Sequence, residues 1–391
     1  YKGVKLIYSN APSTSPKWGN FATGVVGDRF VLLANHPKVL RDAINNAQLP
    51  RLSLNSSPNY QEVLQQLTQR QLGLTYVNLG EFNAAFNDVS EVEYSPAILG
   101  IGLELDPQGL LAQTSLLTEN ANETLIIPTF SEPVKAGQYL PVSSALAIGS
   151  RDLSQFSDRL WAGIKSGNPF ANLLAQSLSK LEEEWGIQLQ ADIFNVVKGE
   201  YALALLPSAE GNQPNWIFVA EKSPETDAAF DRLDAIAEER GYKLTPLNLE
   251  NQEVSVWTKL ITTEQGNIQL KAKVGGVHTR LENYEIFATS VHAMDEALKA
   301  PQNSLFDSKK LQASIARIST PNQGYLYLNW PSSQNFLESQ LPILKVVNSL
   351  GEPLLENLRS LTLTTYISED NANKGSLFLR LASGEKREKG I

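Results

Sequence analysis

The sequence contains no cysteine among its 391 residues, and only three histidines. The absence of cysteine excludes disulfides, thiolate metal ligands and a cysteine nucleophile. It fits either a reducing compartment or a bacterial envelope space, in which free thiols are a liability. The histidines are His36, His278 and His292, and no two of them have the i, i+4 spacing of a helical metal site. The sequence therefore predicts neither a metal site nor a cofactor.

Long apolar runs and clusters of basic residues are also lacking. The longest apolar run, near residues 96–105, has about ten residues, which is too short to span a bilayer. The formal net charge is −9 and the lysines and arginines are dispersed, so a nucleic-acid surface is disfavoured. An apolar content of 42% with 19% charged residues is typical of globular domains, and the length allows two or three domains with packed cores.

One stretch organises the rest of the chain. Residues 25–46 read as a strand, a turn at Gly27 and Asp28, a second strand and an amphipathic helix that begins at Pro37. Residues 277–300 repeat this order of strand, turn, strand and helix. The two stretches predict a β-hairpin followed by a helix, present twice.

The repeat continues beyond the hairpin. Ser53 matches Ser304 and Gly73 matches Gly324, both at an offset of 251 residues. An offset that several elements share indicates an internal duplication. Hairpins, rather than a regular alternation of strand and helix, argue against a doubly wound parallel sheet. The sequence therefore predicts an α+β fold of duplicated units, each of mainly antiparallel sheet covered by helices.

The repeat also predicts where the units begin and end. Residues 1–125 are the C-terminal part of a first unit whose opening segment is absent from this chain, and residues 141–383 are a complete second unit. Residues 126–140 form a connector and residues 384–391 a charged tail. We expect a precursor to supply an opening of about 110 residues, because without it the strand at residues 4–8 is an unpaired edge.

Two segments carry a family resemblance. YKGVKLIY at residues 1–8 and VVGDRFVLLANHPKVLRDAINN at residues 25–46 resemble the cyanobacterial family catalogued as domain of unknown function 3352, and LPVSSALAIGSRDLSQF at residues 140–156 resembles that family's unit opening. The resemblance implies a precursor tethered by an N-terminal hydrophobic anchor that this chain lacks. It implies a location in the periplasm or thylakoid lumen, and it supplies no catalytic residues.

One pair of fragments resembles a serine-enzyme signature. Ser177 and Lys180 fit an S-x-x-K pattern, and Lys165, Ser166 and Gly167 resemble K-T-G. In penicillin-binding enzymes the second motif lies on a strand well downstream of the nucleophile, whereas here it lies upstream. The order is wrong, so no catalytic residues are predicted and the protein is not expected to be an enzyme.

Aromatic and amide residues recur at alternating positions of two equivalent strands. Such residues either form the core and stabilise neighbouring strands, or present an exposed surface for a partner or ligand. The candidate surface consists of Tyr76, Asn78, Tyr325, Tyr327, Asn329 and Trp330.

The preferred function is that of a non-catalytic, membrane-tethered domain that binds a protein partner. The alternative is a carrier or chaperone for an apolar ligand such as a lipid or pigment, and an enzyme of unrecognised type is third. A contiguous polar groove would favour partner binding. A dry apolar pocket of several hundred Å³ would favour the carrier.

Overall fold

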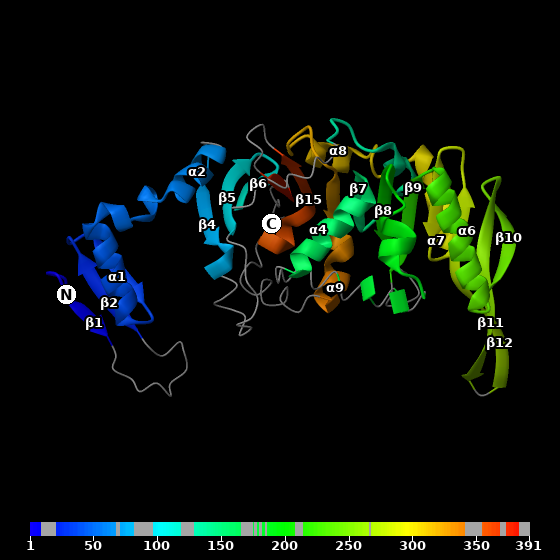
Figure 1. The fold of residues 1–391 in the computed structure, drawn as a ribbon, viewed down its shortest axis with the longest axis horizontal. Helices are drawn as coiled ribbons and strands as arrows, with labels where there is room; N and C mark the ends of the chain where they lie inside the picture. The colour runs from blue at the N-terminus through cyan, green and yellow to red at the C-terminus, as the bar shows by residue number, and fades with distance from the viewer. Residues whose placement is uncertain are drawn as a thin grey trace, which may run out of the picture. The chain divides into compact units, whose positions relative to one another are not determined.

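The computed structural model contains two compact units, Tyr1–Gln66 and Leu67–Ile391. The structure describes residues 1–8, 21–67, 71–81, 97–118, 129–165, 175, 178–179, 182–183, 186–207, 214–265, 267–340, 354–367 and 373–382. Every pair of neighbouring strands in these ranges is antiparallel, and helices pack on the sheets (Figure 1). The predicted α+β class is confirmed.

The first unit is a three-stranded sheet with a helix on one face. Its helix α1 starts after His36, whose Nδ1 accepts a hydrogen bond from the backbone N–H of Lys38 at 3.1 Å. Leu40 and Ile44 of α1 are buried. The elements, in chain order, are β1 (Leu6–Tyr8), β2 (Ala22–Val26), β3 (Phe30–Ala34), α1 (Pro37–Gln48), the 3-10 turns η1 (Pro50–Leu52) and η2 (Leu54–Ser56), and α2 (Pro58–Gln66).

The second unit contains a thirteen-stranded sheet. In spatial order its strands are β10 (Lys243–Leu249), β11 (Gln252–Gln265), β12 (Asn267–Arg280), β13 (Tyr284–Ala288), β9 (Asn215–Glu221), β8 (Glu200–Leu206), β7 (Leu146–Arg151), β14 (Tyr325–Asn329), β15 (Leu358–Ile367), β16 (Asn373–Leu381), β6 (Gly109–Thr118), β5 (Ala97–Asp106) and β4 (Gly73–Asn78). Its helical elements are η3 (Lys135–Tyr139), α4 (Leu153–Lys165), η4 (Gln190–Phe194), α6 (Pro224–Glu239), α7 (Val291–Lys299), η5 (Ala300–Gln302), α8 (Lys309–Ile315) and α9 (Trp330–Gln340). The β11–β12 hairpin extends past the strands beside it (Figure 1).

Helices cover both faces of the β11–β12–β13 region. On one face Met294 of α7 lies in a core cluster with Val277 and Ile286. On the other face Phe230 of α6 lies in a second cluster with Phe287. Burial of side chains of this size stabilises the fold by about 1.5–3 kcal/mol each. The sheet in this region is therefore sandwiched, and every residue of β13 is buried.

The two repeats contain the same order of elements. The described chain from β2 to β6 has a hairpin, helix α1, helix α2, strand β4 and a hairpin, and the chain from β12 to β16 has a hairpin, α7, α8, β14 and a hairpin, with α9 after β14. The pairing also matches. Leu74 pairs with Gly102, and Gly102 pairs with Gln113.

In the second repeat, the equivalent residues pair in the same order from strand to strand. Tyr325, the counterpart of Leu74 at the 251-residue offset, pairs with Thr364, and Thr364 pairs with Ser376. Gln113 and Ser376 are therefore equivalent positions, and they pair with each other where β6 meets β16. The two repeats join through equivalent strands in a symmetric register.

The compact units do not follow the predicted unit boundaries. Their border, between Gln66 and Leu67, lies inside the predicted first unit of residues 1–125, because β4, β5 and β6 continue the large sheet through β16. In the described part of the predicted connector at residues 126–140, Val134 and Ala136 are buried in the core. The tail at residues 384–391 lies outside the described residues.

Candidate functional site

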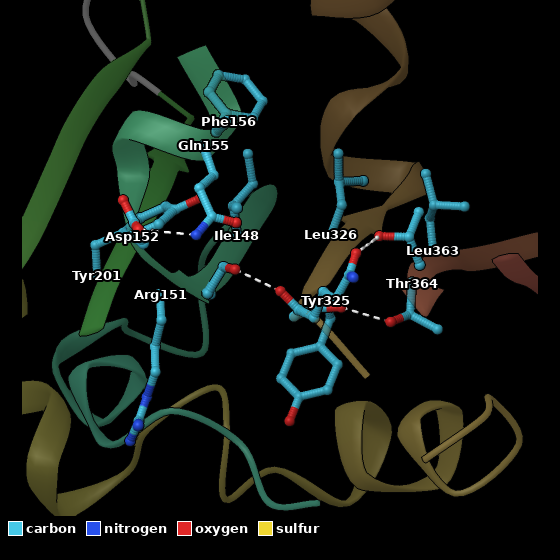
Figure 2. Close-up of a pocket in the computed structure, with 15 residues that line it drawn as sticks. Ile148, Arg151, Asp152, Gln155, Phe156, Tyr201, Tyr325, Leu326, Leu363 and Thr364 are labelled. Carbon is cyan, nitrogen blue, oxygen red and sulfur yellow. Dashed lines mark hydrogen bonds between the residues drawn. The ribbon is translucent and has the colours of Figure 1, made fainter. Parts of the chain in front are cut away.

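A cavity of about 240 Å³ lies on the sheet of the second unit, beside the start of α4. Figure 2 shows Ile148 of β7, Leu326 of β14 and Phe156 of α4 around it, whereas the side chains of Arg151 and Tyr325 point to the other side. Ligand pockets usually measure about 300–1,000 Å³, so this cavity is small for a lipid or a pigment.

The polar groups that line this cavity form hydrogen bonds with other groups of the protein. Asp152 accepts a hydrogen bond from Gln155 Nε2 at 2.9 Å. Burial acts to raise the pKa of Asp152, but hydrogen bonds from Ser154 and Gln155 outweigh it, so the pKa is lowered and the carboxylate stays ionised. The Thr364 hydroxyl donates to the carbonyl of Gly324 at 2.6 Å. The arrangement can hold a small polar group. Beside it, Lys198 Nζ donates to Ser154 Oγ at 2.7 Å, and the Ser154 hydroxyl donates to Asp152.

The six residues predicted as a partner or ligand surface divide into two groups. Tyr325, Tyr327 and Trp330 are buried, so they contribute to the core rather than to an exposed surface, which is the other alternative that their spacing allows. Burial also raises the pKa of Tyr327. Asn329 and Tyr76 are partly buried and Asn78 is exposed. These six residues therefore do not form one exposed aromatic surface.

The other titratable residues singled out from the sequence serve the fold. His278 of β12 is buried, with Nε2 at 2.8 Å from Oδ1 of Asp234 on α6. In the part of the chain that the structure describes, no group of three or more histidine or acidic side chains is arranged to hold a metal ion. Ser177 and Lys180 lie outside the described residues.

A different feature stands out in the first unit, on the sheet face opposite α1. Ile7 pairs with Thr23 and Thr23 with Leu33, so their side chains form one row. Val25 pairs with Val31 in the next row. The apolar members of these rows are exposed: Ile7 by 58%, Val25 by 53%, and Val31 and Leu33 by 65% each. We call these four residues the bare face.

The corresponding face of the second repeat is covered. Following the hairpin register, His278 and Phe287 correspond to Thr23 and Leu33, and Phe287 is only 5% exposed. The cover is α6, whose Phe230 and Leu233 pack in the same cluster as Phe287. No described element covers the bare face in this way. The two repeats therefore share a hairpin but differ in the helix above it.

The edge of this small sheet is also open. Strand β3 reads FVLLA and is the last strand of the first unit's sheet, so its outer N–H and C=O groups have no strand partner in the described chain. Its counterpart β13 is paired there with β9, from Tyr284 with Glu221 to Ala288 with Ile217. Proteins normally protect such edges with charges, proline or a covering element. An apolar edge beside an apolar face is the surface that β-augmentation uses.

The sequence contained a signal for the bare face that the repeat alone did not reveal. All five residues of β3 are apolar, which is typical of a strand buried on both faces, yet among the described elements α1 packs on one face of it and none covers the other.

A match of the sequence to a family model decides the family. The model of a protein of unknown function, DUF3352, matches residues 1–381.

The chain belongs to the DUF3352 family. No curated protein and no solved structure matches this DUF3352 chain. Within the described ranges, no helix combines the length and the apolarity needed to cross a bilayer.

Proposed function

We propose that this DUF3352 protein is a non-catalytic binding protein whose first unit docks a protein partner. One observation carries the proposal, namely the bare face beside the open edge of β3. Ile7, Val25, Val31 and Leu33 present branched apolar side chains on one face of the sheet. The edge at β3 offers backbone donors and acceptors that have no strand partner in the described chain. Removal of apolar surface from water contributes about 25 cal/mol per Å², so a partner that covers this face gains stability from it.

The proposed partner is a protein rather than a lipid or pigment. A carrier encloses its ligand in a cavity, and the described cavity beside Ile148 and Phe156, at about 240 Å³, is smaller than the usual ligand pocket of about 300–1,000 Å³. The bare face lies beside the open edge of β3. A polypeptide can form backbone hydrogen bonds with that edge, whereas an acyl chain cannot.

We also propose that the protein has no enzymatic activity of its own. The His278 and Asp234 pair is built into the packing and does not line the cavity, and Asp152, which does line it, is hydrogen-bonded to Gln155. Its proposed location is the periplasm or thylakoid lumen of a cyanobacterium, on a membrane tether. The absence of cysteine and the family resemblance of residues 1–8 and 25–46 support this location. Fractionation of cells that carry a tagged gene tests it, and recovery in the cytosol contradicts it.

Capture of partners by matched variants tests the proposed function. The full chain and the variant Val31→Asp with Leu33→Asp are immobilised and exposed to extract of the source cells. Leu260→Asp is the control, because Leu260 is exposed by 69% on the β11–β12 hairpin and belongs to the second unit, whereas the bare face belongs to the first. We expect a partner that the wild type and the control retain and that the double variant loses. Equal capture by all three proteins contradicts the proposal.

A further inference from the structure

A two-stranded ribbon projects from the second unit at the β11–β12 hairpin. Strand β10 pairs with β11 only over Gln252–Thr258, and β13 pairs with β12 only over Val277–Arg280. Beyond these ranges β11 and β12 pair only with each other in the described chain, from Lys259 with Lys273 to Gln265 with Asn267. We call residues 259–274 the finger. Figure 1 shows its two strands running past the ends of the neighbouring strands.

The root of the finger is fixed to the body of the second unit. The register of the two strands shifts there, because Gly275 is an extra residue on β12. A β-bulge of this kind bends the strand and sets the direction of the residues beyond it. A Cβ on Gly275 would lie 2.5 Å from the Tyr242 ring, so the close packing requires glycine. Lys259 Nζ lies over the same ring and donates to the carbonyl of Arg240 at 2.7 Å.

One face of the finger is apolar and exposed. Directly paired residues of an antiparallel pair point to the same face, and successive residues alternate between faces. Leu260 pairs with Ala272, and Leu270, which pairs with Thr262, lies on the same face. Leu260 is 69% exposed and Leu270 is 71% exposed, among the highest values for large apolar side chains in the described ranges. The finger therefore presents a small apolar surface to water.

The opposite face of the finger is basic. Lys259 pairs directly with Lys273, and Lys271 lies on the same face. Like charges that are directly opposite destabilise a strand pair. Lys271 and Lys273 are exposed, and none of the salt bridges between described residues includes either of them. The finger holds three lysines and one acidic residue, Glu264, in a chain whose net charge is −9, so its chemistry favours an anionic partner.

We propose that the finger binds the surface of an anionic lipid bilayer. Leu260 and Leu270 enter the headgroup region, and Lys271 and Lys273 interact with the lipid phosphates. Elements at a membrane interface combine shallowly inserted apolar side chains with lysines whose apolar stems reach to the phosphates. The ribbon is one backbone thick, so the ammonium groups stay close enough to the anionic surface to be attracted by it. This surface belongs to the second unit and is distinct from the bare face, so the proposal goes beyond the proposed function.

The charges of the finger favour a bilayer over a polypeptide partner. Lysines on exposed strands are a device by which proteins prevent the addition of a further strand, and the finger carries three of them. Lipid phosphates are attracted by the same lysines. The strand edges of the finger have no partner in the described chain, so their backbone groups need water. Water is present among lipid headgroups and absent from the hydrocarbon core, so the finger inserts shallowly and does not cross the bilayer.

Flotation of the full chain with lipid vesicles tests the proposal. One set of vesicles contains phosphatidylcholine alone, and the other contains phosphatidylcholine and phosphatidylglycerol in equal parts. We expect the wild type to bind the anionic vesicles, to bind the neutral ones much less, and to bind more weakly as salt is added. Lys271→Gln with Lys273→Gln should weaken binding to the anionic vesicles by at least about fivefold. Leu260→Ser with Leu270→Ser should weaken it by at least about tenfold.

Two control variants make the same chemical changes elsewhere in the second unit. Leu105→Ser removes a leucine that is 71% exposed on β5, near the other end of the strand order. Lys309→Gln with Lys310→Gln removes two exposed lysines at the start of α8. Both controls should bind the anionic vesicles as the wild type does. All substituted side chains are exposed, so the fold should persist, and circular dichroism checks this.

The outcomes separate this proposal from the proposed function. It is overturned if the wild type binds anionic vesicles no better than neutral ones, or if the finger variants bind as well as the controls. It is also wrong if no vesicles are bound and the finger variants instead lose a protein captured from extract, since the partner is then a polypeptide. None of these results affects capture through the bare face, which Val31→Asp with Leu33→Asp tests in the first unit.

Discussion

The carboxylate of Asp234 on α6 lies 2.8 Å from Nε2 of His278 on β12. The same oxygen accepts a hydrogen bond from the indole N–H of Trp257 on β11 at 2.7 Å. One carboxylate on the helix therefore holds two neighbouring strands of the sheet below it. The contact is part of what fixes α6 over the second repeat.

Replacement of this carboxylate should destabilise the protein. Asp234→Ala leaves the His278 ring, which is 4% exposed, and the Trp257 N–H without their partner. Unpaired buried polar groups cost about 1–3 kcal/mol each, so we expect a loss of about 2–4 kcal/mol in the free energy of unfolding. Urea denaturation measures it. The control is Asp231→Ala, because the Asp231 side chain is 68% exposed, and it should lose less than about 1 kcal/mol. Equal losses would contradict the assignment.

The stability of the second unit should fall as the pH rises. Burial, followed by the neighbouring carboxyl of Asp227, raises the pKa of Glu285 to about 8. The folded state therefore holds a proton that the unfolded chain releases near its ordinary carboxyl pKa. The stabilisation is complete below that ordinary pKa and is lost as the pH rises through about 8.

Glu285→Gln tests this pH dependence because the amide stays neutral at every pH. We expect the wild type to lose on the order of 2–4 kcal/mol between pH 5 and pH 9, and the variant to lose much less and to be the more stable protein at pH 9. Urea denaturation at both pH values provides the measurement. Glu282→Gln removes a charge at the exposed turn before β13 and should follow the wild type. A wild type that is more stable at pH 9 than at pH 5 would refute the assignment.

Equivalent positions of the two repeats should respond differently to the same substitution. Leu33→Lys places a charge on the bare face, where it remains in water, so the free energy of unfolding should change by less than about 0.5 kcal/mol. Phe287→Lys places the charge beneath α6 beside Phe230 and should cost more than about 4 kcal/mol or prevent folding. Thermal denaturation of both variants provides the comparison. A large loss in Leu33→Lys would mean that the bare face is covered within the chain.

The Glu200 carboxylate should fix the backbone of residues 134–140 through hydrogen bonds. Its Oε2 accepts from the backbone N–H of Lys135 at 2.8 Å and of Ala136 at 3.3 Å, and its Oε1 lies 2.7 Å from Arg151. We expect Glu200→Ala to cost about 2–4 kcal/mol, because it leaves buried donors unpaired. Amide hydrogen exchange should accelerate around residues 134–140, whereas Glu253→Ala, at an exposed position of β11, should leave exchange there unchanged.

The local elements could be predicted from the sequence because their signals are local. Pro37 at the start of α1, and the apolar stripe that includes Phe230 and Leu233 on α6, are visible in the spacing alone. The duplication was visible because the offset of 251 residues survives in several elements. The antiparallel α+β class followed from the hairpins.

The arrangement of the elements could not be predicted in the same way. That β6 pairs with β16 depends on which edges meet in space, and periodicity contains no information about that. The burial of Tyr325 and Tyr327 also depends on their neighbours in the sheet, since alternation along a strand does not say which face is covered. The bare face could not be predicted because an apolar strand is normally expected to be buried. The difference is visible only when β3 is compared with its counterpart β13, which α6 covers.

The pairing of Gln113 with Ser376 carries a consequence for the symmetry of the sheet. Two equivalent strands that pair in antiparallel fashion about equivalent residues form an isologous contact, as subunits of a two-fold dimer do. A chain that held a single repeat would possess, in this strand, an edge complementary to itself. Within the thirteen-stranded sheet, one chain therefore contains at β6 and β16 the kind of contact that two identical subunits make across a two-fold axis.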